Sequence, residues 1–137
     1  MRRYLLDSTP LAGFLHGRPQ FVSRIAPLIT RREVATSILV YAEVAEYLKG
    51  LPDYDRRREQ LRTLLLSVYP YFLTYPILDR YADIRRALRA PHGPGLIGDI
   101  DTLIAATALE RNLTVITTDT DFERVPDLDT MLLPRSS

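Results

Sequence analysis

Residues 97–119 read IGDIDTLIAATALERNLTVITTD. Apolar and small residues recur over 99–111 at helical spacing, and Asn112 can end such a helix. The β-branched run at 113–117 then predicts a buried strand, followed by a turn that begins at Asp119. A helix whose small residues face a sheet, directly followed by a strand, indicates an α/β protein.

The same alternation extends over the rest of the chain. Strands are expected at 3–6, 34–36, 71–74, 113–117 and 130–133. Helices are expected from near Pro10 to 15, then at 20–30, 37–49, 53–68, 76–89 and 99–111, with 91–95 as a loop. Since parallel strands need crossover connections, the order predicts a three-layer α/β/α sandwich around a mainly parallel sheet of about five short strands.

Two helices carry more specific expectations. Pro27 should bend or shorten the helix at 20–30, because proline removes a helical hydrogen bond. In the helix at 37–49, Ser37 can cap the first turn. Its apolar stripe is expected to consist of Ile38, Tyr41, Ala42, Ala45 and Leu48, with Glu43 and Glu46 off the stripe.

Composition limits the class of protein. The chain has 137 residues, 46% of them hydrophobic, which suits one core and a single domain over 1–137. The net charge of +1 does not indicate a nucleic-acid binder, so a polyanion would have to be held by local patches. The absence of cysteine excludes disulfides and thiolate metal sites, and neither a signal peptide nor a membrane span is evident. A cytoplasmic location is expected.

Acidic residues stand at the ends of the expected elements. Asp7 and Asp119 follow strands, Asp101 begins a helix, and Glu43 lies within one. In open α/β sheets ligands bind at the carboxyl ends of strands, so these side chains could share one crevice. Each also has a structural interpretation: Asp7 as a helix cap, Glu43 as a solvated residue, and the others as cap or turn residues. Both histidines, His16 and His92, are expected on the surface.

Four segments resemble one known family. They are YLLDST at 4–9, TS at 36–37 with AEV at 42–44 and Gly50, IGDIDTLIAATA at 97–108, and TTDTDFERVP at 117–126. Together they look like PIN-domain nucleases, and within that family like VapC-type ribonuclease toxins of toxin-antitoxin pairs. One departure is Ser8-Thr9, where the family commonly has Thr-Asn, although a hydroxyl there can still hydrogen-bond a carboxylate.

The resemblance implies a PIN-like fold and roles for the acids. Asp7, Glu43, Asp101 and Asp119 match the four family acids, with Asp121 a competitor for the fourth role and Asp99 a helix cap. Carboxylates suit Mg²⁺ or Mn²⁺, which prefer oxygen ligands and activate water for phosphodiester hydrolysis. The implied function is a metal-dependent endoribonuclease, with RNA as substrate, a cognate antitoxin that covers the acidic groove, and a homodimer.

Two alternatives remain beside this interpretation. A catalytically inactive PIN-like module could act by binding proteins alone, although retention of four acids argues against it. An aspartyl-phosphate mechanism would need a second Asp two residues after the first, where this chain has Thr9. The arginine run 56–58 and the arginines at 85, 86 and 89 are the candidates for RNA contact.

Overall fold

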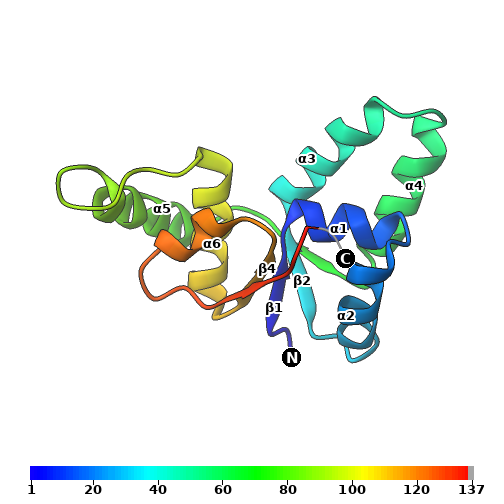
Figure 1. Ribbon diagram of the computed structural model, residues 1–137, viewed down its shortest axis with the longest axis horizontal. Helices are drawn as coiled ribbons and strands as arrows, with labels where there is room; N and C mark the ends of the chain where they lie inside the picture. The colour runs from blue at the N-terminus through cyan, green and yellow to red at the C-terminus, as the bar shows by residue number, and fades with distance from the viewer. Residues whose placement is uncertain (136–137) are drawn as a thin grey trace.

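The computed structural model describes residues 1–135, which form a parallel five-stranded sheet with helices on both sides (Figure 1). The strand order is β3-β2-β1-β4-β5, and every neighbouring pair is parallel. The strands are β1 Tyr4–Leu6, β2 Val34–Ser37, β3 Tyr69–Tyr71, β4 Thr114–Thr117 and β5 Thr130–Leu132. The predicted α/β sandwich is therefore confirmed, with a sheet that is parallel throughout.

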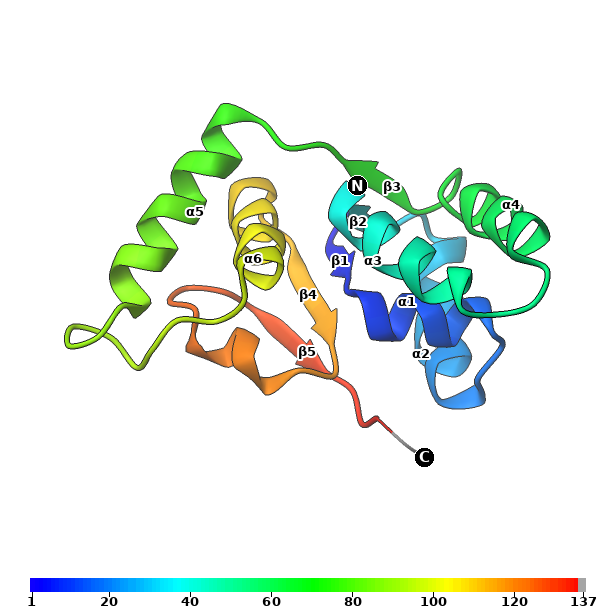
Figure 2. The ribbon, with the colours of Figure 1, turned by 90° about the horizontal axis from the view of Figure 1, so that it is seen from above.

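The helices divide between the two sides of the sheet. Helices α5 and α6 lie on one side, and α1 and α2 lie on the other, with α3 and α4 packed beside α1 (Figure 2). Their bounds are α1 Ser8–Leu15, α2 Pro19–Thr30, α3 Ile38–Lys49, α4 Tyr54–Leu64, α5 Tyr75–Leu88, α6 Asp99–Arg111 and the 3₁₀ helix η1 Thr120–Arg124. In the part of the chain that the structure describes, no helix has the length and apolar character needed to cross a bilayer.

Strand β1 lies at the point where the topology changes direction. The chain adds β2 and β3 on one side of β1 and then returns to add β4 and β5 on the other. Leu6, the last residue of β1, is paired with Ile116 of β4. The segments that follow β1 and β4 therefore emerge side by side at the carboxyl edge of the sheet, which is where ligands bind in folds of this class.

The core consists of strand residues and of the inward faces of the helices. All of β2 is buried, and α6 buries residues 104–108, most of which are small, as the sequence predicts. The stripe predicted for α3 is confirmed only at Leu48, because the other residues that the helix buries are Val40 and Val44. Apolar residues occupy most positions of this helix, so periodicity alone does not select its inward face.

The structure also tests the predictions for β3, for Pro27 and for Ser37. Strand β3 covers 69–71 instead of 71–74, and it carries Pro70, which an edge strand tolerates. Pro27 does not shorten α2, which continues to Thr30. Proline leaves the carbonyl of Ser23 without its helical donor, and because Ser23 and Pro27 are exposed, water can hydrogen-bond to that carbonyl. Ser37 caps α3 as predicted, since its side chain accepts a hydrogen bond from the backbone N–H of Leu39.

Candidate metal centre

Asp7 is buried at the carboxyl end of β1, with 7% of its surface exposed. It occupies the N-cap position of α1, but its side chain makes no capping hydrogen bond. Instead, the buried hydroxyl of Thr117 on β4 donates to Asp7 Oδ2 at 2.7 Å. The carboxylate is thus held towards the neighbouring strand end, which favours a site at this edge over a simple capping role.

Asp101 lies in the first turn of α6, where it is partly buried. Burial, together with the negative charges of Asp7, Asp119, Glu43 and Asp121, raises the pKa of its carboxyl to about 7. Burial likewise raises the pKa of Asp7; a hydrogen bond from Thr117 opposes this rise, and the charges of Glu43 and Asp119 reinforce it. Mutual repulsion of this kind requires that the acids lie close together.

Asp119 and Asp121 come from the turn that follows β4. The hydroxyl of Thr117 accepts a hydrogen bond from the Asp119 N–H at 3.0 Å, and Asp119 Oδ1 accepts one from the Asp121 N–H at 2.9 Å. Asp121 also forms an ion pair with Arg124 at 3.4 Å. One carboxylate oxygen from each of Asp101, Asp119 and Asp121 lies within 4.8 Å of the others. The fold therefore brings both candidates for the fourth acid to Asp101.

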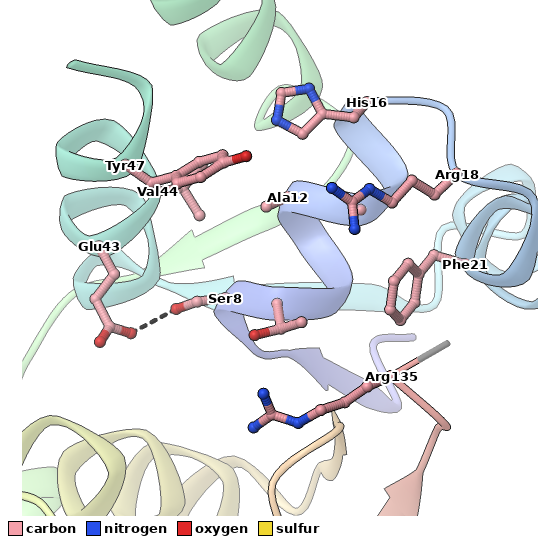
Figure 3. A pocket seen from close by; sticks show the side chains of 11 residues that line it. Ser8, Ala12, His16, Arg18, Phe21, Glu43, Val44, Tyr47 and Arg135 are labelled. Atoms are coloured by element: carbon pink, nitrogen blue, oxygen red, sulfur yellow. Dashed lines mark hydrogen bonds between the residues drawn. The ribbon is translucent and has the colours of Figure 1, made fainter. Parts of the chain in front are cut away.

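Glu43 reaches the same region from α3. The hydroxyl of Ser8, at the start of α1, donates to Glu43 Oε1 at 2.5 Å (Figure 3). Glu43 is partly buried, so it is not the freely solvated helix residue that a lone glutamate would suggest. The Ser8 hydroxyl has the function expected of a polar residue at this position, because it orients an acidic side chain.

Asp99 does not belong to this group. Its Oδ1 accepts hydrogen bonds from the Tyr81 hydroxyl at 3.0 Å and from Arg85 at 2.8 Å, both on α5. Gly98 occupies the N-cap position of α6, and Asp99 is the first helical residue. The expectation that Asp99 caps the helix is therefore wrong. Its carboxylate connects α6 to α5 through an ion pair with Arg85.

We call Asp7, Glu43, Asp101, Asp119 and Asp121 together the acidic centre. Most of its negative charge is not neutralised by ion pairs. Within residues 1–135 only Asp121 of these five forms an ion pair. All the donors are carboxylate oxygens, the ligands that Mg²⁺ and Mn²⁺ prefer. Because buried carboxylates are costly without a counter-charge, the donor set fits a divalent cation.

Thr117 is the residue of this site that sequence reasoning missed. Its hydroxyl donates to Asp7 and accepts from the Asp119 backbone, so one side chain orients both strand-end acids. The available signal was a threonine at the end of a strand next to the strand of Asp7. That signal depends on the pairing of β1 with β4, which the sequence alone does not establish.

Comparisons with known proteins are consistent with this geometry. The sequence model of the PIN domain matches residues 4–128. The fold is similar to VapBC from Salmonella typhimurium bound to DNA, with a TM-score of 0.83 and 18% identity over 96% of this chain and 98% of the other. VapBC2 from Rickettsia felis, bound to a DNA fragment from its promoter, has a TM-score of 0.81 and 21% identity over 95% and 98%.

A third similar structure is FitAcB from Neisseria gonorrhoeae. It has a TM-score of 0.80 and 26% identity, over 93% of this chain and 96% of the other. No curated protein sequence matches the chain. The match to the PIN domain covers all five residues of the acidic centre.

Proposed function

The chain belongs to the PIN domain family, and from this membership we propose that it is a metal-dependent endoribonuclease, the toxin of a type II toxin-antitoxin pair. The observation that carries the proposal is the convergence of the acidic centre at the carboxyl ends of β1 and β4. The similar solved structures, which include VapBC complexes, support the toxin-antitoxin assignment. A substrate of cellular RNA would place the protein in the cytoplasm.

Asp7, Asp101 and Asp119 would hold the metal, with Glu43 and Asp121 completing the donor set. A bound Mg²⁺ or Mn²⁺ supplies a water of lowered pKa and offsets charge on the scissile phosphate. Thr117 holds the Asp7 carboxylate in place, and Ser8 holds that of Glu43. Asp101, with a pKa of about 7, gives up its proton as the cation binds, so binding tightens as the pH rises towards neutrality.

RNA contact would depend on arginines whose charge is free. Several of the arginines considered from the sequence are engaged: Arg58 pairs with Asp55 and Glu59, and Arg85 pairs with Asp99. Arg86 and Arg89, which are exposed on and just after α5, form no ion pair with any residue of 1–135. These two are the better candidates for phosphate contacts in that region.

Partners are proposed on two grounds. The antitoxin is supported by the similarity to VapBC and FitAcB structures. A homodimer is supported by five exposed apolar side chains of residues 66–78, the segment that includes the edge strand β3. We call these side chains the β3 patch; they are Leu66, Tyr69, Phe72, Tyr75 and Leu78.

The rival function is an inactive protein-binding module on the same fold. Both functions accommodate a β3 patch and a partner, but an inactive module has no need of buried and partly buried acids that repel one another, which are typical of functional sites. Purified protein should cleave single-stranded RNA with Mg²⁺ or Mn²⁺, and EDTA, Asp7→Asn or Asp101→Asn should abolish cleavage. Cleavage that persists in either variant, or in EDTA, would refute the metal mechanism. An inert wild type that is folded by circular dichroism would favour the binding module.

A further inference from the structure

A pocket of about 340 Å³ opens beside the acidic centre, between α1, α2 and α3 (Figure 3). One of its lining residues, Glu43, belongs to the acidic centre, and another, Ser8, donates a hydrogen bond to it. We propose that this pocket receives one nucleobase of a single-stranded RNA whose adjacent phosphate lies at the acidic centre. The proposal rests on the proposed function and assigns to that site a subsite that selects among bases.

The floor of the pocket is apolar and closely packed. Phe21 of α2 is 1% exposed and packs directly on the backbone of α1. A Cβ at Gly13 would stand only 2.1 Å from a Phe21 ring carbon, so the glycine is what allows this approach. Ala12 and Val44 complete the floor. A flat aromatic solute fits such a surface, because it removes apolar area from water without requiring hydrogen bonds across the floor.

Tyr47 provides an aromatic wall that solvent can reach. It is 45% exposed, and its ring meets the His16 ring edge to face at a centroid distance of 5.7 Å and an angle of 74°. The tyrosine ring thus contacts His16 and remains partly open to solvent; both side chains line the pocket (Figure 3). Exposed aromatic side chains beside a phosphate site are the usual stacking platforms for unpaired bases.

His16 supplies a hydrogen-bonding group for a base edge. Its Nε2 is buried and has no partner among residues 1–135, and the side chain lines the pocket. Burial and the neighbouring Arg57 and Arg18 lower its pKa, so the ring is neutral at pH 7. A buried nitrogen without a partner is unfavourable, and a base that pairs with it would remove that deficit. His16 was expected on the surface, but it is partly buried and lines the pocket.

Charge at the pocket favours a nucleotide over an apolar peptide side chain. Arg18 and Arg135 are exposed at its border, and neither forms an ion pair with a residue of the described chain. Figure 3 shows both guanidinium groups beside the pocket, while the carboxylate of Glu43 lies at its other side. Cations here would attract the sugar-phosphate backbone that flanks a bound base, and they offset the repulsion between RNA and the acidic centre.

The two histidines allow a direct test. In Asp101→Asn with EDTA, which prevents cleavage, imidazole signals are followed by NMR during titration with pentanucleotides of uracil, cytosine, adenine or guanine. His16 should shift with at least one of them, while His92, in the distant loop after α5, serves as the internal control. Tyr47→Ala should weaken that binding by about tenfold or more, whereas Tyr47→Phe should retain it.

The other outcomes separate the base subsite from the proposed catalysis. An abasic oligomer that shifts His16 as strongly would show that the pocket takes backbone and not a base. Cleavage of RNA by the wild type without any His16 shift would assign the pocket to another occupant, such as a side chain of a protein partner. A His16 shift in a protein that never cleaves RNA would retain the base subsite and refute the proposed catalysis.

Discussion

At the scale of single residues, Asp101 connects stability with pH. Its folded pKa of about 7 exceeds the ordinary value of 3.8, so between these pH values the folded protein binds more protons than the unfolded chain. The free energy of unfolding of the metal-free protein should therefore fall as the pH rises from 4 to 7. Asp101→Asn should reduce this fall, to which the raised pKa of Asp7 also contributes, and it should be more stable at pH 8 by about 1–2 kcal/mol, since solvent screens part of the repulsion.

Urea denaturation in EDTA at pH 4.5 and pH 8 measures this difference. The Asp99→Asn variant is a matched control, because Asp99 pairs with Arg85 on the surface and its loss should cost less than about 1 kcal/mol at either pH. Equal pH slopes in wild type and Asp101→Asn would contradict the assignment of a strained carboxyl to Asp101.

Thr117 is expected to strengthen metal binding, because its hydroxyl orients the Asp7 carboxylate. Thr117→Val removes the hydrogen bond to Asp7 and the acceptor for the Asp119 N–H, and it should lower Mn²⁺ affinity by about tenfold or more. Thr107→Val is the control, because the Thr107 hydroxyl is equally buried but donates only to the Leu103 carbonyl of its own helix. Calorimetric titration of both variants makes the comparison. Wild-type affinity in Thr117→Val would show that Asp7 needs no such support.

The sequence predicted individual residues unevenly. Asp7 and Asp119 follow strands, so the rule for open α/β sheets placed them at the correct edge. Asp99 and Asp101 lie in the same helical turn about 200° apart, since each residue advances roughly 100°. Spacing alone could not decide which of the two faces the sheet edge. The structure separates them, because α5 offers Arg85 and Tyr81 to Asp99.

At the scale of elements, the contact between α1 and α2 should be sensitive to one methyl group. Gly13→Ala places a Cβ against the buried Phe21 ring and should reduce the free energy of unfolding by about 1–3 kcal/mol. Gly50→Ala adds the same methyl where the nearest contact is an ordinary 3.5 Å, so it should be nearly neutral. Thermal denaturation of the two variants tests this. Equal melting temperatures would contradict the close packing of α1 on Phe21.

The sequence predicted the boundaries of a helix or strand well where its local residue pattern was unambiguous. Helix α6 and strand β4 are close to their predicted spans, because a β-branched run directly follows a helix of small residues. The inward face predicted for helix α3 is right only at Leu48, since apolar residues lie on most sides of this helix and only tertiary packing selects Val40 and Val44. Strand β3 shifted because an edge strand has one neighbour to fix its register.

At the scale of the whole molecule, the packing of α1 on α2 buries large apolar side chains. Phe21 and Ile25 of α2 are fully buried, and α2 contacts α1. Five of the exposed large apolar side chains lie in the β3 patch, and a sequence pattern could not show this because it depends on which strand is at the edge.

The β3 patch predicts the state of association. Phe72 and Tyr75 are 64% and 85% exposed, and replacing both by arginine should convert a dimer into a monomer. Leu132→Arg is the control, because Leu132 is 43% exposed on β5 at the opposite edge of the sheet. Sedimentation velocity gives the masses. A wild type that sediments as a monomer, or a double variant that remains dimeric, would contradict the assignment.

The most direct measurement is Mn²⁺ binding by calorimetry at pH 8, where Asp101 is ionised, to the wild type, Asp101→Asn and Asp99→Asn. The two aspartates lie in the same turn, but only Asp101 lies in the acidic centre. Wild type and Asp99→Asn should bind with similar affinity, and Asp101→Asn should bind at least about tenfold more weakly. Equal binding by all three proteins, or no binding by the wild type, would contradict a metal centre at the ends of β1 and β4.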